Sequence, residues 1–147
     1  MNGRAAQKAE ESQLLVLDVD GVLTDGSVLY GASDQAEIKS FNIKDGLGIK
    51  LLQKSGIEVA IITGRTSAAV ERRAAELSIA TVVQGLPDLS ALTLAGLATC
   101  PNDAAAPVQN MADWIAPCAG GQGAVRALSD FLLTSQGLMS ARLSEFH

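Results

Sequence analysis

Residues 14–26 read LLVLDVDGVLTDG, and the fold assignment starts from this stretch. The four apolar residues Leu14–Leu17 stop abruptly at Asp18. A short apolar run that ends in a polar turn is typical of a buried strand in a parallel sheet, although periodicity alone leaves a buried helix open. Asp18 and Asp20 therefore stand at the carboxyl end of the expected strand, which is where open α/β sheets bind their ligands.

The spacing of these two carboxylates has a chemical consequence. Side by side they repel each other, unless a divalent cation shares them or one of them is protonated. A carboxylate paired with a metal can attack phosphorus, and its neighbour can hold a proton for the leaving alcohol. Gly21 and Gly26 permit a sharp turn whose N–H groups can approach a phosphate. The plain alternative is an Asx-rich turn after a strand, without catalytic meaning.

A second apolar strand also ends in polar residues. Glu58–Thr63 reads EVAIIT and is followed by Gly64 and Arg65. A hydroxyl and backbone amides at a strand end that opens a helix favour a phosphate-oxygen site. Arg65 can grip an anionic substrate, or it can simply form a surface ion pair. If the two strands are neighbours, about 4.8 Å apart, the side chains of Asp18 and Thr63 lie within about 6 Å of each other.

Expected strands and helices alternate along the chain, which predicts an α/β fold with a doubly wound, Rossmann-like parallel sheet. We expect the strand at 14–17 in the centre, the strand at 59–62 beside it and the strand at 81–83 outside that. Residues 28–30 and 36–41 are expected to form a β-hairpin. The remaining expected elements are helices at 45–55, 67–77, 103–112 and 123–137, and short strands at 97–100 and 114–115.

The domain organisation follows from length and local polarity. A chain of 147 residues predicts a single domain. Residues 1–13 are polar, so we expect a disordered N-terminal segment followed by one domain over 14–147. Within this domain, residues 27–41 form the hairpin.

Composition excludes several classes of function. Hydrophobic residues make up 48% of the chain but aromatic residues only 3%, which predicts an aliphatic core. The net charge of −5 argues against nucleic acid as a partner. The longest apolar run is far too short to span a membrane. Two cysteines, with no secretory leader expected, indicate reduced thiols and a cytoplasmic protein.

The motifs together resemble a known family. DVDGVLTDG at 18–26 and IITGR at 61–65 are similar to the first two motifs of the haloacid dehalogenase (HAD) superfamily. FNIKDGLGIK at 41–50 and GGQGAVRAL at 120–128 resemble the 3-deoxy-D-manno-octulosonate 8-phosphate phosphatase family, over roughly residues 14–138. The resemblance implies a Mg²⁺-dependent phosphomonoesterase of lipopolysaccharide biosynthesis. It would act through an aspartyl-phosphate on a small acidic sugar phosphate, most plainly 3-deoxy-D-manno-octulosonate 8-phosphate.

The resemblance also implies roles for individual residues. Asp18 matches the nucleophile and first metal ligand. Asp20 matches the general acid/base and binds the metal through its backbone carbonyl. Thr63 matches the hydroxyl that orients the phosphoryl group. The positions that match substrate contacts are Asp20, Asn42, Ile43, Lys44, Asp45, Gly46, Lys50, Arg65 and Arg73. Two of these have plainer readings: Asp45 as the N-cap of a helix, and Arg73 on a solvated helix face.

The family implies an assembly as well. Its members are usually tetramers whose cap is only the hairpin, and neighbouring subunits complete the closure of each active site. The segment at 120–128 would lie beside a neighbour's site, with Gln122 where the family has Arg. We therefore expect a homotetramer with the hairpin of residues 27–41 in its interface.

The chain departs from the family after Gly85. Leu86-Pro87-Asp88-Leu89 resembles the end of the family's late acidic motif, and roughly 25–30 residues before it, about one helix and one strand, have no counterpart. The missing part would carry a lysine and two aspartates, so Mg²⁺ would have fewer carboxylate ligands and more waters. We expect residues 97–100 to move in and pair with Leu14–Leu17, which would bring Asp88 to the metal as a substitute ligand.

Two other functions stay open from the sequence. A catalytically impaired or silent homologue would bind sugar phosphate, or serve as an oligomeric interaction protein, without turnover. A response-regulator receiver domain would also accept phosphate on an aspartate. The receiver needs an acidic pair before the acceptor and a lysine after a late strand, and neither is visible.

Overall fold

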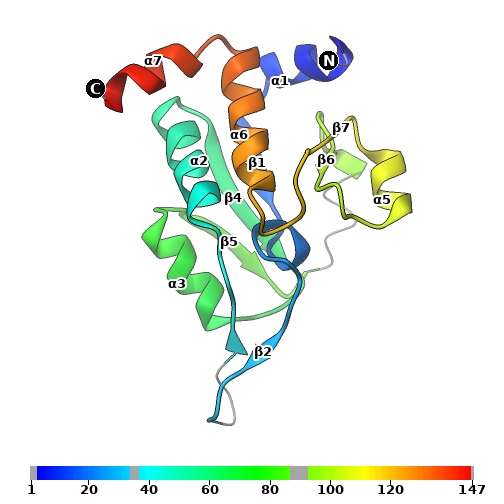
Figure 1. Cartoon of the computed structure of the whole chain (residues 1–147), viewed down its shortest axis with the longest axis vertical. Coiled ribbons are helices and arrows are strands. Elements are labelled where there is room, and N and C mark those ends of the chain that lie inside the picture. Colours follow the sequence, from blue (N-terminus) through cyan, green and yellow to red (C-terminus); the bar gives the residue numbers. More distant parts are fainter. Residues whose placement is uncertain (1–2, 34–36, 87–92, 147) are drawn as a thin grey trace.

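The computed structural model describes residues 3–33, 37–86 and 93–146 (Figure 1). Three strands form a parallel sheet: β1 (Leu14–Leu17), β4 (Glu58–Thr63) and β5 (Thr81–Gln84). The sheet order is β1-β4-β5, with Leu17 opposite Ile61 in the register. The α/β class and the three expected strands are confirmed. The expectation that the strand at 14–17 is central is wrong for the described residues, because β4 lies in the middle and β1 at an edge.

Helices on one side of the sheet build the core. They are α2 (Ile43–Lys54), α3 (Ala68–Glu76) and α6 (Ala124–Ser135), and Figure 1 shows α2 and α6 side by side in front of β4. Alternate strand residues point to this side, because successive side chains of a strand face opposite ways. Leu17, Val59 and Ile61 are accordingly buried together with the helical residues Ile49, Leu52, Val125 and Leu132.

The N-terminus corrects an expectation. Helix α1 (Gly3–Glu10) occupies most of the segment expected to be disordered. Its small residues Ala5 and Ala9 are buried, one helical turn apart, and α1 packs against α6. Lys8 reaches Asp113 at 2.7 Å and ties the helix to a segment 105 residues later in the chain. Contacts with distant elements therefore stabilise a helix whose own sequence is mostly polar.

The hairpin stands away from the sheet at one end of the molecule (Figure 1). Its strands β2 (Leu29–Tyr30) and β3 (Glu37–Ile38) pair antiparallel, which confirms the hairpin although both strands are shorter than expected. Leu29, Tyr30 and Ile38 are exposed on it. A free hairpin of this size is marginally stable in water, so contacts with the rest of the domain must hold it.

The expected repair of the sheet edge is wrong. Strand β6 (Thr99–Cys100) pairs in parallel with β7 (Trp114–Ile115), and not with β1. The intervening helix α5 (Ala106–Met111) brings β7 alongside β6, and the main-chain groups of Ala98 and Cys100 bond to this neighbouring segment. The backbone around β6 is therefore satisfied locally and has no need of β1. The last elements, α7 (Met139–Leu143) and a short 3₁₀ turn, complete the described chain.

Strand β1 is left at the edge of the described sheet. Among the described residues β1 has β4 as its only strand partner, and Leu14 and Val16 remain 53% and 40% exposed. These two residues alternate with the more buried Leu15 and Leu17, so the face of β1 that points away from the helices is open. Within the described residues no helix is long and apolar enough to cross a membrane.

Candidate active site

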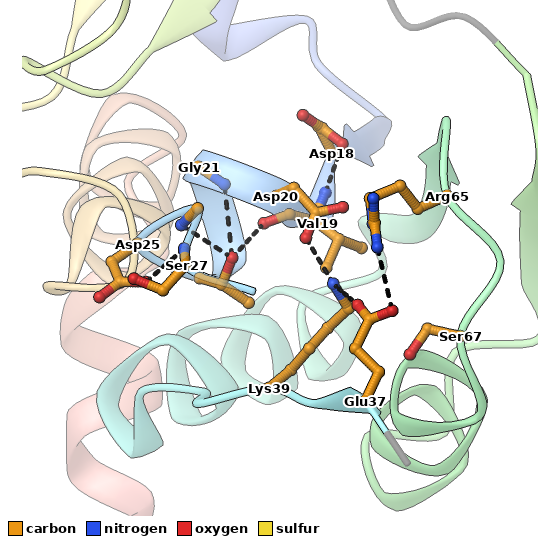
Figure 2. A network of polar contacts seen from close by, with 12 residues as sticks. Asp18, Val19, Asp20, Gly21, Asp25, Ser27, Glu37, Lys39, Arg65 and Ser67 are labelled. Atoms are coloured by element: carbon orange, nitrogen blue, oxygen red, sulfur yellow. Dashed lines mark hydrogen bonds and ion pairs between the residues drawn. The ribbon is translucent and has the colours of Figure 1, made fainter. Parts of the chain in front are cut away.

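The loop after β1 places the two aspartates. Asp18 follows the last residue of β1, and its carboxylate accepts a hydrogen bond from the N–H of Val19 at 2.6 Å. The turn at Gly21 uses a positive φ of 87°, which favours glycine. The buried hydroxyl of Thr24 accepts bonds from the N–H groups of Gly21 and Gly26 at 3.4 and 3.2 Å. These contacts fix the loop that carries both aspartates (Figure 2).

Thr63 is the last residue of the neighbouring strand β4, so it lies at the same carboxyl end of the sheet as Asp18. The register pairs Leu17 with Ile61, so Asp18 stands opposite Ile62, one residue before Thr63. The two residues therefore end neighbouring strands, and the expected side-chain distance of about 6 Å stays a prediction. Thr63 is 1% exposed, and its hydroxyl has no hydrogen-bond partner among the described residues. A buried hydroxyl is normally satisfied, so its position suits a ligand oxygen such as that of a phosphate.

A chain of alternating charges joins the hairpin to both strand ends (Figure 2). The ammonium of Lys39 lies 2.6 Å from an oxygen of Asp20 and 2.6 Å from an oxygen of Glu37. Arg65, which follows β4, contacts the other oxygen of Glu37 at 3.2 Å. The four side chains therefore link the loop after β1, the hairpin and the loop after β4 into one network.

The network shifts the pKa values of Glu37, Lys39 and Arg65. The hydrogen bond from Lys39 holds the pKa of Glu37 below its usual range. Burial by itself lowers the pKa of Lys39, but the bonds to Asp20 and Glu37 outweigh it and the pKa is raised. The bond to Glu37 likewise raises the pKa of Arg65. All three groups are thus charged at neutral pH.

Sequence reasoning missed Glu37 and Lys39. Both lie in the expected hairpin, two residues apart, so they share one face of an extended segment while Ile38 takes the other. Two opposite charges on the inner face of a hairpin were the available signal. Nothing in the local sequence indicated that this face turns toward Asp20.

Gly120 and Gly121, which precede α6, pack against the loop that follows β1. Gly120 packs so closely that an added Cβ would lie 1.9 Å from the carbonyl oxygen of Gly21. The N–H of Gly121 donates to the carbonyl of Val22 at 3.0 Å. The expectation placed this segment beside a neighbouring subunit. Within the chain it packs against the loop that carries Asp18 and Asp20.

Several expected substrate residues serve the fold. Asn42 is the N-cap of α2: its side-chain oxygen accepts from the N–H of Lys44, and its amide donates to Gly121. Asp45 is not the N-cap, because it is 1% exposed and accepts from the N–H of Arg126 at the start of α6. Burial raises the pKa of Asp45 despite these backbone bonds. The structure places Asp45 in the core, with no surface to offer a substrate.

The basic residues are divided between surface and interior. Lys44 and Lys50 are exposed on α2, as is Ile43 at its start. The guanidinium of Arg73 lies over the ring of Phe41, 5.7 Å from its centroid. The same guanidinium packs on Gly46, where an added Cβ would lie 2.5 Å from it. Only Arg65 of the expected cations joins the network around Asp20.

A groove adjoins this network. It has a volume of about 450 Å³ and runs between the hairpin and α3. Its lining includes Glu37 and Lys39 on one wall, and Arg72 and Arg73 on the other. Glu76 lies on the same wall and pairs with Arg72 at 3.4 Å and with Arg73 at 3.3 Å, so it offsets part of their charge.

The residues at this site supply some of the oxygen ligands that Mg²⁺ needs. Across residues 3–33, 37–86 and 93–146, no three His, Cys, Asp or Glu side chains gather as a metal cluster. Asp88, the expected substitute ligand, lies outside the described residues. Mg²⁺ is usually bound through one or two carboxylates, together with waters and phosphate oxygens. The carboxylate of Asp18 and the main-chain carbonyl of Asp20 are oxygen donors of the right kind.

Three features together are those of a phosphatase domain of the HAD type. They are the carboxylate at the end of β1, the buried hydroxyl at the end of β4 and the hairpin that contacts Asp20. The 3-deoxy-D-manno-octulosonate 8-phosphate phosphatase KdsC of Salmonella typhi is 39% identical, with 88% of this chain and 84% of the relative aligned. The chain therefore belongs to the 3-deoxy-D-manno-octulosonate 8-phosphate phosphatase family. No family model matches the chain.

Solved structures agree with this assignment. The phosphatase of the same name from Moraxella catarrhalis, solved with magnesium, phosphate and KDO, has a TM-score of 0.94 at 34% identity. The match covers 100% of this chain and 99% of that one. A Legionella pneumophila structure described as a putative HAD hydrolase of subfamily III A has a TM-score of 0.91 at 32% identity, covering 98% and 94%.

The alignment also bears on the expected gap. It spans 158 positions, although it uses 88% of a 147-residue chain, which is about 129 residues. About 29 positions of the Salmonella relative thus have no counterpart here. This agrees with the expected loss of roughly 25–30 residues, about one strand and one helix.

Proposed function

We propose that the chain is a Mg²⁺-dependent phosphomonoesterase that hydrolyses 3-deoxy-D-manno-octulosonate 8-phosphate through an aspartyl-phosphate. The observation that carries the proposal is the joint position of Asp18, Asp20 and the unpartnered hydroxyl of Thr63 at one sheet edge. A relative named for this substrate aligns over most of the chain, and a structural neighbour contains Mg²⁺, phosphate and KDO.

The reaction uses these residues in two steps. A carboxylate oxygen of Asp18 forms a bond to phosphorus while the ester bond to the sugar oxygen breaks. Asp20 gives its proton to that oxygen, so the sugar leaves as an alcohol. Asp20 then takes a proton from water, which attacks the phosphorus and releases phosphate from Asp18. The hydroxyl of Thr63 donates to a phosphoryl oxygen in both steps.

Asp18 and the carbonyl of Asp20 would hold Mg²⁺, which neutralises negative charge on the phosphoryl oxygens when bound. Arg65 adds a positive charge beside Asp20 without bonding to it. We place the acidic sugar in the adjoining groove, where Arg72 and Arg73 offer charge to its carboxylate. Lys44 and Lys50 remain proposed contacts only for parts of a substrate that reach the exposed face of α2.

Phosphate release from the sugar phosphate and from p-nitrophenyl phosphate, with and without Mg²⁺, tests the proposal. The wild type should turn over both substrates, and EDTA should stop the reaction. Asp18→Asn should lose at least about 10³-fold in kcat, because the nucleophile is gone. Asp25→Asn is the matched control, since Asp25 caps the exposed N–H of Ser27. A folded wild type that binds the sugar phosphate without any turnover would instead support the silent homologue.

For the assembly we propose a homotetramer with the hairpin in its interface. Support comes from the apolar residues that the hairpin exposes, above all Tyr30 at 80%. Monomeric proteins rarely expose contiguous apolar surface of this kind. Sedimentation at micromolar concentration should show a tetramer that Tyr30→Glu dissociates, while Leu94→Glu, at another exposed position, does not. A monomeric wild type would refute the assembly.

We also propose that the protein acts in the cytoplasm, in lipopolysaccharide biosynthesis. Cys100 and Cys118 are both free thiols, and free thiols are the usual state in a reducing compartment. Fractionation of cells that express the protein tests the location. Its presence in a periplasmic fraction would contradict it.

A further inference from the structure

Lys39 is the most completely buried charged side chain of the network around the candidate active site. Its side chain is 0% exposed, and its ammonium contacts Asp20 and Glu37 at 2.6 Å each. Figure 2 shows it rising from the hairpin between the two carboxylates. Removing an ammonium from water is costly unless it is paired and hydrogen-bonded. Two short contacts of opposite charge meet this condition.

The two partners of Lys39 have different surroundings. Glu37 belongs to the same hairpin, and its second oxygen binds Arg65. Asp20 belongs to the loop after β1, nineteen residues earlier in the chain. The contact with Glu37 alone would suffice to keep the lysine paired within the hairpin. The contact with Asp20 is the one that connects the hairpin to the proposed proton donor.

We propose that Lys39 is a positioning residue that aims Asp20 at the leaving-group oxygen of the substrate. This inference rests on the proposed function. The ammonium holds oxygen Oδ1 of Asp20, so the carboxyl group cannot rotate freely and its other oxygen carries the proton toward the substrate. Because Lys39 comes from the hairpin, the same contact aligns Asp20 only when the hairpin is docked on the domain.

The chemistry of the leaving group makes this inference specific. A sugar leaves as a strongly basic alkoxide unless Asp20 supplies a proton as the ester bond breaks. A p-nitrophenolate is a weak base and leaves without a proton. Misaligning Asp20 should therefore slow release of the sugar from its phosphate far more than release of p-nitrophenolate from the aryl phosphate. A defect in the nucleophile, the metal site or the fold would slow both substrates alike.

The test compares kcat/KM for the sugar phosphate and for p-nitrophenyl phosphate in Lys39→Met. This ratio reports the steps up to leaving-group release and excludes the later hydrolysis of the aspartyl-phosphate, in which Asp20 serves as base for both substrates. General acid catalysis is typically worth about 10²- to 10⁴-fold. We expect kcat/KM to fall at least about 30-fold on the sugar phosphate and less than about 3-fold on the aryl phosphate. Lys39→Arg should recover part of the sugar-phosphate activity, since it restores a buried cation. Lys54→Met, at an exposed lysine, should leave both rates unchanged.

Each result decides the inference. Equal losses on both substrates, or no loss on either, would overturn it and leave the proposed function intact. A wild type inactive on both substrates would overturn the proposed function and this inference with it. If Lys39→Met does not fold, Lys39→Gln is measured instead. The ratio of sugar-phosphate to aryl-phosphate kcat/KM must fall in that variant as well, or the inference is wrong.

Discussion

Replacement of Gly120 by alanine should disable the active-site loop without unfolding the protein. An added Cβ would lie 1.9 Å from the carbonyl oxygen of Gly21 and 2.5 Å from its carbonyl carbon. Both atoms are main chain, so no flexible side chain can move aside. Gly21 sits one residue after Asp20, and the clash therefore acts directly on the segment that carries the proposed acid/base.

The size of the effect follows from this distance. Real Cβ atoms essentially never approach another heavy atom within 3.0 Å, so the loop or the segment at Gly120 must move by at least about 1.1 Å. Overpacking of this kind typically costs about 1–3 kcal/mol. A domain with about 5–15 kcal/mol of stability would remain folded. A misplacement of about 1 Å at a catalytic group can cost about 10²-fold in rate.

The assay measures kcat/KM on the sugar phosphate together with urea unfolding for Gly120→Ala. Gly96→Ala is the matched control, because no atom lies within 4 Å of the Cβ position at Gly96. We expect a loss of about 10²-fold in kcat/KM for the first variant and none for the second. If Gly120→Ala keeps full activity and full stability, the reasoning that this glycine supports the loop is refuted.

Three further predictions concern stability. Burial raises the pKa of Asp45, so its contribution to stability is present below about pH 4 and is lost as pH rises through the raised pKa. Urea unfolding from about pH 4 to 7 should show Asp45→Asn gaining on the wild type. Asp113→Asn should be less stable than the wild type above about pH 4, and this difference should shrink as pH falls through the lowered pKa of Asp113, because the hydrogen bond from Lys8 stabilises only the charged carboxylate. Ala9→Glu should lose about 1–3 kcal/mol at the buried face of α1, whereas exposed Gln7→Glu should change stability by less than about 0.5 kcal/mol.

The sequence predicted the strands well because their signal is local. Residues 14–17, 59–62 and 81–83 are short apolar runs bounded by polar residues, and all three form strands within one residue of the expected bounds. The predicted order of these three strands was also correct, with 59–62 next to 14–17 and 81–83 next to 59–62. The position of β1 at an edge was not, because it depends on which other segments reach the sheet. That information is not contained in the apolar run itself.

The misses share a physical cause: partners that are far away in the sequence. Helix α1 owes its order to the surface of α6, and two alanines among polar residues are a weak local signal. Asp45 was expected to face a ligand, but its partner is the N–H of Arg126, 81 residues later. Lys39 escaped notice because its contact with Asp20 depends on how the hairpin folds back over the loop.

The site residues show the same division between local and distant information. Asp18, Asp20 and Thr63 follow or end apolar strands, so the strand pattern alone was enough to predict that they share one edge of the sheet. Within α2 the sequence could not separate the exposed Lys44 from the buried Asp45 beside it. Helical neighbours point in different directions, and only the packing of α6 decides which side becomes core.

The edge position of β1 explains why contacts from outside the sheet matter so much here. Among the described residues, β1 is bonded to one strand, and the loop after it has no second strand to steady it. Three other contacts hold that loop: the hydroxyl of Thr24 from within, Lys39 from the hairpin and Gly121 from the segment before α6. Each comes from a different part of the chain. The two variants Lys39→Met and Gly120→Ala therefore disturb one loop from opposite sides, and their effects on sugar-phosphate turnover should be less than multiplicative when they are combined, because both act through the placement of Asp20.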